Sequence, residues 1–174
     1  MQDILLVVDM QNDFIDGPLG SGEARAIVGR AAHKMRGFPG RVITTRDTHE
    51  KDYLETQEGQ KLPVPHCVRG TPGWQLHPLI EAERREEPVD KPVFGSAALG
   101  QALYEENKRE PIRSIELIGL CTDICVISNA LLLRAFLPET EIIVNASCCA
   151  GVTPQSHKTA LEAMKACQVR VKNE

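Results

Sequence analysis

The sequence lacks an excess of basic residues, a long hydrophobic run and a CxxC pair of cysteines. The 20 Lys and Arg residues against 24 Asp and Glu residues give a net charge of −4, which provides no electrostatic basis for binding nucleic acid or an anionic membrane. The first apolar run, residues 4–8, ends at Asp9 and is too short for a signal-peptide core or a membrane span. We therefore expect a cytoplasmic protein with neither nucleic acid nor membrane as a partner.

Aromatic residues are also scarce, at 4% of the chain, but the hydrophobic fraction of 42% is ordinary. A length of 174 residues suits one domain with a substantial core, so residues 1–174 are predicted to form a single domain. None of the six cysteines has the CxxC spacing of a zinc ribbon or a thioredoxin-type redox centre. In a cytoplasmic protein they are expected to be thiols.

Short aliphatic runs alternate with longer amphipathic stretches along the whole chain. The aliphatic runs predict strands over residues 3–8, 41–45, 89–93, 114–119, 141–145 and 169–171. The amphipathic stretches predict helices over 23–37, 97–107, 122–137 and 154–167, while 9–22 and 46–73 are predicted as loops. This alternation predicts an α/β fold, a three-layer α/β/α sandwich around a mostly parallel six-stranded sheet.

Residues able to do chemistry follow four of the predicted strands. Asp9 ends the first, Asp47 and His49 follow the second, Lys91 is near the third, and Cys125 follows the fourth. Taken singly, each has an ordinary structural explanation, and for Cys125 that explanation is a small core residue. Because parallel α/β folds place their sites beyond the carboxyl ends of the strands, the convergence of these residues favours an active site.

Cys125 has a local reason to be reactive. If Thr122 is the N-cap of the following helix, Cys125 is the third residue of its first turn. The helix dipole there, and a nearby ammonium such as Lys91, would favour a thiolate. The free backbone amides of the same turn could hold an oxyanion, so acyl-transfer chemistry becomes possible.

A second cluster consists of Asp47, His49 and, further along the loop, His66. One carboxylate and two imidazoles suit a divalent transition metal that keeps open coordination positions. The alternative, which spacing alone favours, is a loop held by ordinary hydrogen bonds from these side chains. Four acidic residues in the same loop could add an oxygen ligand: Glu50, Asp52, Glu55 and Glu58.

Five blocks of the sequence resemble the isochorismatase-like cysteine hydrolases, and among these most closely the nicotinamidases. They occur in family order, as VDMQNDF at 8–14, TRDTH at 45–49, PHCVRGTPG at 65–73, Lys91, and GLCTDICV at 119–126. The resemblance implies a catalytic triad of Asp9, Lys91 and Cys125. It further implies a cis peptide bond between Leu120 and Cys121, with the amides of Cys121 and Cys125 forming the oxyanion hole.

The nicotinamidase likeness implies that Asp47, His49 and His66 bind zinc or iron(II), with manganese as an alternative. Glu58 is our first choice for a further ligand and Glu55 our second. Phe14 would form part of the wall against which an aromatic substrate packs. Many nicotinamidases have Trp where Thr48 stands here and an aromatic residue where Pro63 stands, so Trp74 is expected either to replace that wall or to lie at a surface.

The resemblance implies a metal-containing amidohydrolase that converts nicotinamide to nicotinate and ammonia through a Cys125 thioester, in NAD salvage. One alternative is a hydrolase of the same family acting on another small amide, a carbamoyl compound or a vinyl ether. A second alternative is a non-catalytic metal- or thiol-binding protein on the same scaffold. Relatives often form dimers or tetramers, so a homo-oligomer is left open.

Overall fold

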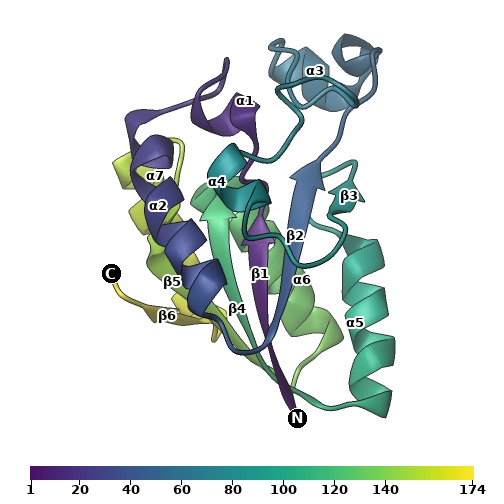
Figure 1. Cartoon of the computed structure of the whole chain (residues 1–174), viewed down its shortest axis with the longest axis vertical. Helices are drawn as coiled ribbons and strands as arrows, with labels where there is room; N and C mark the ends of the chain where they lie inside the picture. The colour runs from purple at the N-terminus through teal and green to yellow at the C-terminus, as the bar shows by residue number, and fades with distance from the viewer.

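Six parallel strands form the centre of the protein in the computed structural model, which describes residues 1–174 (Figure 1). All neighbouring strands pair in parallel, in the order β3-β2-β1-β4-β5-β6. Chain order therefore reverses direction between β1 and β4, the position at which parallel α/β sheets form crevices. The strands are β1 Gln2–Val8, β2 Arg41–Asp47, β3 Val89–Lys91, β4 Ile112–Leu120, β5 Glu141–Ala150 and β6 Arg170–Lys172.

Helices cover both faces of the sheet, and the side chains of β1 alternate between the two cores they create. Leu5 and Val7 pack with α1, α2 and α4, whereas Leu6 and Val8 pack with α5, α6 and α7. The helices are α1 Asn12–Ile15, α2 Gly22–Gly37, α4 Pro78–Glu81, α5 Ala97–Arg109, α6 Ile127–Phe136 and α7 Pro154–Ala166. None of them combines the length and the apolarity needed to cross a membrane.

The three-layer fold expected from the sequence is thus confirmed, but several boundaries and short elements differ. β5 continues to Ala150, five residues beyond the expected end, and β3 stops at Lys91 because Pro92 has no N–H for the ladder. The expected loop 9–22 contains α1, and the expected loop 46–73 contains η1 Tyr53–Glu55 and α3 Gln57–Lys61. Helices of three to five residues are too short to show helical periodicity, which is why the pattern missed them.

A buried carboxylate on β4 gives a test of the fold that is independent of any activity. Glu116 is only 4% exposed, and its carboxylate lies 2.9 Å from Lys34 Nζ of α2 and 3.0 Å from Lys172 Nζ of β6. Burial alone would raise the pKa of Glu116, but these two ammonium groups and Asn145 lower it below its ordinary 4.5. The group therefore ties one helix and the edge strand to the middle of the sheet.

Replacing Glu116 with Gln is expected to lower the free energy of unfolding by about 2 kcal/mol at pH 7, because hydrogen bonds to a charged group are lost. Since the folded-state pKa lies below the unfolded one, this contribution is present above pH 4.5 and is lost as the pH falls through the folded value. Urea unfolding of both proteins at pH 7 and at lower pH measures it. Glu141→Gln, at an exposed pair with Arg170, is the matched control, with an expected change below about 0.5 kcal/mol.

Candidate active site

The carboxyl ends of β1, β2 and β3 and the segment after β4 bring four chemically capable residues to one place. Asp9 follows β1, Asp47 ends β2, Lys91 ends β3, and Cys125 lies in η2 (Thr122–Val126) after β4. Asp9 and Lys91 have no exposed surface and Cys125 is 4% exposed. Water is therefore largely excluded from these groups, and the electrostatic interactions among them are strengthened.

Lys91 lies at the centre of this group, and its ammonium contacts each of the other three side chains. Its Nζ is 2.6 Å from Asp9 Oδ2, 3.2 Å from Asp47 Oδ1 and 3.4 Å from Cys125 Sγ. The same ammonium donates a hydrogen bond of 3.1 Å to the carbonyl of Val93. The three residues expected to form a triad are thus joined through one buried cation.

The carboxylate of Asp9 is held in a fixed orientation. Its Oδ1 accepts a 2.6 Å hydrogen bond from the hydroxyl of Thr45, which is fully buried on β2. Its Oδ2 accepts no hydrogen bond apart from the Lys91 ion pair. Thr45 was not identified from the sequence, although it faces the same side of β2 as Asp47, two residues on. One oxygen of Asp9 is therefore anchored, and the other remains able to receive a proton.

Burial opposes the effects of the helix dipole and of Lys91 that were expected to favour a thiolate at Cys125. Burial, followed by Asp9, raises the pKa of Cys125 well above its ordinary range, and the opposing effect of Lys91 is smaller. Burial also raises the pKa of Asp9. Burial alone would lower the pKa of Lys91, but Asp9, Cys125 and Asp47 raise it. Burial therefore favours the thiol form of Cys125 and the protonated form of Asp9.

The turn that carries Cys125 begins one residue earlier than expected. Cys121, not Thr122, is the N-cap of η2, and the amides of Ile124 and Val126 both donate to its carbonyl. The i-to-i+5 bond from Val126 makes this a π-helical turn, a form often found at functional sites. The hydroxyl of Thr122 instead lies 2.8 Å from Nδ1 of His157 on α7. The peptide bond between Leu120 and Cys121 is cis, as the resemblance implies.

Close backbone packing brings this turn next to Asp9. Gly119, with φ of +117°, lies against the carbonyl of Val8, where any Cβ would overlap that carbonyl. Only glycine accommodates both the positive φ and the contact. Asp9 itself has a φ of +48°, which directs the chain out of β1 at the base of the site. The ends of β1 and β4 are thus as close as the backbone allows.

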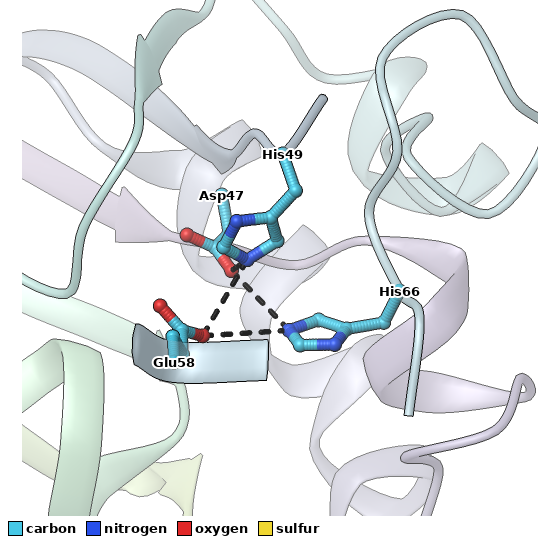
Figure 2. A group of neighbouring side chains, drawn as sticks. All are labelled: Asp47, His49, Glu58 and His66. Carbon is cyan, nitrogen blue, oxygen red and sulfur yellow. Dashed lines mark hydrogen bonds and ion pairs between the residues drawn. The ribbon is translucent and has the colours of Figure 1, made fainter. Parts of the chain in front are cut away.

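Two carboxylates and two imidazoles form a second group beside Lys91. Figure 2 shows Asp47, His49, Glu58 and His66 pointing toward a common centre, and their ligand atoms all lie within 4.8 Å of one another. Nε2 of His49 is 2.9 Å from Asp47 Oδ2 and 3.5 Å from Glu58 Oε1, and Nε2 of His66 is 3.6 and 3.9 Å from the same oxygens. Of the four acidic residues considered in this loop, the group includes only Glu58.

The donor set fits a divalent transition metal on its chemistry. Nδ1 of His66 lies 2.8 Å from the carbonyl of Val64, which can only accept, so Nδ1 carries the proton and Nε2 offers its lone pair to the centre. Burial alone would raise the pKa of Asp47, but His49, His66 and Lys91 lower it. Two nitrogen and two oxygen donors, with the His66 ring held by the Val64 carbonyl, match zinc or iron(II) better than magnesium or calcium.

Asp47 belongs to both groups, and its backbone is held by a residue that sequence reasoning did not assign. The buried side chain of Gln11 accepts a 2.7 Å hydrogen bond from the Asp47 amide and donates a 2.8 Å hydrogen bond to its carbonyl. A side-chain amide thus pairs with Asp47 as a neighbouring strand would. The polar residue in the VDMQNDF block, two positions after Asp9, is the signal that could have identified Gln11.

The aromatic residues around the four-residue group are only partly those expected. The Phe14 ring lies 5.4 Å from that of His66, as a wall residue would. Tyr53, which sequence reasoning missed, packs 4.6 Å from the His49 ring and is buried. The Trp74 ring instead stacks 3.7 Å from the guanidinium of Arg46 and donates to the hydroxyl of Thr48. The structure therefore brings Phe14 to the four-residue group but leaves Trp74 against residues that do not belong to it.

A cavity of about 700 Å³ lies elsewhere, between α2, the end of β5 and α7. Its lining includes Arg30, Cys149 and His157 but no residue of the Lys91 cluster or of the four-residue group. The chemically capable residues are therefore concentrated at the strand ends, not in this cavity.

Comparisons with known proteins find relatives that match nearly the whole chain. Residues 3–173 match the family described as the Isochorismatase domain. The chain is 28% identical to the nicotinamidase/pyrazinamidase of Mycobacterium tuberculosis over 183 aligned residues, which cover 96% of each chain. It superimposes with a TM-score of 0.82 on the crystal structure of the nicotinamidase PncA of Bacillus subtilis, at 27% identity, over 99% of this chain and all of that one. The pyrazinamidase of Pyrococcus horikoshii, crystallised in complex with zinc, has the same fold, with a TM-score of 0.81 at 23% identity over the full length of both chains.

Proposed function

The chain belongs to the isochorismatase family, and on that premise we propose that it is a cysteine amidohydrolase that converts nicotinamide to nicotinate and ammonia. The observation that carries this proposal is the buried ammonium of Lys91, 2.6 Å from the Asp9 carboxylate and 3.4 Å from the Cys125 thiol. The nicotinamidases among its relatives support the choice of substrate. Nicotinamide released by cytoplasmic NAD turnover would then be the natural source of substrate.

Asp9 acts first as a general base. Its Oδ2, which has the Lys91 ammonium as its only polar contact, takes the proton of the Cys125 thiol as the sulfur attacks the amide carbonyl carbon, and a C–S bond forms. The tetrahedral intermediate collapses with cleavage of the C–N bond, and Asp9 returns the proton to the departing nitrogen, so that ammonia leaves. Asp9 then deprotonates the water that cleaves the thioester, which releases nicotinate and restores the thiol.

Two further features stabilise the charges that develop. Lys91 faces both Asp9 and the sulfur, so its positive charge compensates whichever of the two is anionic. The backbone amides of Cys121, the N-cap of η2, and of Cys125, within η2, would donate to the oxyanion of the tetrahedral intermediate. The raised pKa of the Cys125 thiol is consistent with this order of steps, because the proton leaves the sulfur only when the sulfur attacks.

Asp47, His49, Glu58 and His66 would hold a divalent metal, zinc or iron(II). When bound, such an ion is a Lewis acid that can accept a lone pair from a substrate nitrogen and so position the substrate. Phe14 and Tyr53 pack against the two histidines. They orient the imidazole rings and supply an apolar, aromatic surface next to them.

The substrate assignment is tested by measuring ammonia release from a panel of amides. Nicotinamide is expected to be hydrolysed with the highest kcat/KM, and benzamide, which lacks the ring nitrogen, about 100-fold more slowly because it loses the positioning contact. Ammonia release from a carbamoyl compound or an aliphatic amide but not from nicotinamide would favour the alternative, a family hydrolase with another substrate. No release from any member of the panel would defeat the amidase proposal.

Metal content gives a separate prediction. The purified protein is expected to contain about one transition-metal ion per chain by elemental analysis, and the Asp47→Ala/His49→Ala double variant is expected to contain almost none. His77→Ala is the matched control, because His77 lies outside the four-residue group and pairs with Asp16. A full metal complement in the double variant would show that other residues hold the ion.

A further inference from the structure

Asn129 on α6 uses its whole side-chain amide to join two segments of the site. Its Nδ2 donates to the carbonyl of Cys125, at 2.8 Å, and to that of Phe94, at 3.0 Å. Its Oδ1 accepts a 3.0 Å hydrogen bond from the amide of Ser96. Asn129 is 1% exposed, so both of its N–H donors and its carbonyl are satisfied within the protein.

The segment that Asn129 holds is the one that leads away from Lys91. Residues 92–96 connect β3 to α5, and Asn129 fixes this connection at Phe94 and at Ser96. Between these contacts and Lys91 lies Val93, whose carbonyl accepts the 3.1 Å hydrogen bond from the Lys91 ammonium. The position of the ammonium is therefore linked, through one backbone carbonyl, to the position of Asn129.

Asn129 also binds the segment that carries the proposed nucleophile, Cys125. The second Nδ2 hydrogen bond of Asn129 goes to the main-chain carbonyl of Cys125, one helical turn earlier. Lys91 Nζ and Cys125 Sγ are 3.4 Å apart but belong to segments that are 34 residues apart in the sequence. Asn129 ties together the backbones of both segments.

We propose that Asn129 is a positioning residue that holds the Lys91 segment against the Cys125 turn and so maintains the contact between ammonium and sulfur. Asparagine is a poor residue for a helix interior, and a buried amide left unpaired would cost stability. The hydrogen bonds of Asn129 to Phe94 and Ser96 offset both the low helix propensity and the cost of burying the amide. The proposal rests on the hydrolase function for its kinetic consequence but not for its effect on the thiol.

Neighbouring Ser128 provides a matched comparison on the same helix. Its hydroxyl donates a 2.6 Å hydrogen bond to the carbonyl of Ile124, also one turn earlier. Ser128 thus makes the same local type of bond as Asn129 but no hydrogen bond to residues 92–96. The Ser128→Ala variant therefore reports the cost of losing a side-chain bond to the preceding turn alone.

The test compares Asn129→Ser, Asn129→Leu and Ser128→Ala in the full-length protein. Serine can still donate to the carbonyl four residues earlier but is too short to reach the 92–96 segment. We expect Asn129→Ser to lower kcat for ammonia release about 10- to 100-fold with little change in KM. The kcat of Asn129→Leu is expected to fall at least as much, and the kcat of Ser128→Ala is expected to remain close to that of the wild-type protein.

A second readout needs no substrate. The rate at which iodoacetamide alkylates Cys125, followed by mass spectrometry of the peptide that contains it, is measured against pH. In Asn129→Ser the profile should shift to higher pH, because an ammonium farther from the sulfur stabilises the thiolate less. If the wild-type protein hydrolyses no amide, the proposed function fails, and this profile still decides the role of Asn129.

Three outcomes would overturn the proposal. The first is wild-type kcat and a wild-type alkylation profile in Asn129→Ser, and the second is an equal loss in Ser128→Ala. The third is loss of a cooperative thermal transition in both Asn129 variants, which would assign Asn129 to folding instead.

Discussion

The Cys125→Ala variant is expected to release ammonia from nicotinamide at least about 10⁴-fold more slowly than the wild-type protein, because loss of a covalent nucleophile removes the catalysed path. Cys125 is the thiol in contact with Lys91, and Lys91 is paired with the base Asp9. The methyl group of alanine leaves this arrangement without the atom that attacks. Rates at saturating nicotinamide, measured by ammonia detection, give the ratio.

The control for this substitution is Cys167→Ala, because Cys167 is an exposed free thiol just beyond α7. Its activity should equal that of wild type, which separates loss of the nucleophile from a general effect of removing a thiol. Truncating the small buried side chain of Cys125 is expected to cost about 1 kcal/mol of stability, so the variant should remain folded and retain its metal. Activity that survives in Cys125→Ala would remove the nucleophile assignment.

Replacing Lys91 with Met is expected to damage both activity and stability. The fully buried ammonium pairs with both Asp9 and Asp47. Asp47 would keep His49 beside it, but an apolar side chain of similar length at position 91 would leave the Asp9 carboxylate buried without a counter-ion. Such a loss typically costs about 3–5 kcal/mol, and ammonia release should fall at least about 10³-fold as charge compensation disappears. Urea unfolding and ammonia assays measure the two effects separately.

A second substitution shows whether the loss of stability has this electrostatic origin. Adding Asp9→Asn to Lys91→Met removes the unpaired charge, so part of the lost stability should return although activity does not. Lys108→Met, at an exposed pair with Glu105, is the matched control, with an expected change within about 0.5 kcal/mol. If Lys91→Met unfolds at the same urea concentration as wild type, another group must compensate the Asp9 carboxylate.

The sequence predicted the layers of the fold well because buried parallel strands and amphipathic helices leave clear patterns. The uninterrupted aliphatic run of β1 and the spacing of apolar residues in α2 are examples. Helix α2 begins at Gly22, one residue before its expected start, and the Ser21 hydroxyl caps it by accepting a hydrogen bond from the Ala24 amide. Short helices such as α3 depend on local hydrogen bonds that no periodicity reveals.

At the site, the sequence could indicate which residues lie close together but not how their contacts change their pKa values or orientations. Burial raises the pKa of Cys125 more than Lys91 lowers it, and burial is a tertiary property that local reasoning could not include. The stacking of Trp74 on Arg46 is likewise a tertiary event. Gln11, Thr45 and Asn129 act through partners at least 33 residues away, and no local pattern specifies such pairs.

The two oxygens of the Asp47 carboxylate face different neighbours, Oδ1 toward Lys91 and Oδ2 toward the histidines. One side chain thus contacts both groups, so a substitution at Asp47 alters the surroundings of Lys91 and of the histidines together. A related protein without His49 and His66 would still need an acidic residue at the end of β2, or another negative group near Lys91, to balance the charge of the ammonium. Conversely, a cation bound by the histidines and Asp47 Oδ2 would reduce the negative charge that Asp47 Oδ1 presents to Lys91. Metal binding and the reactivity of the Cys125 thiol are therefore expected to depend on each other.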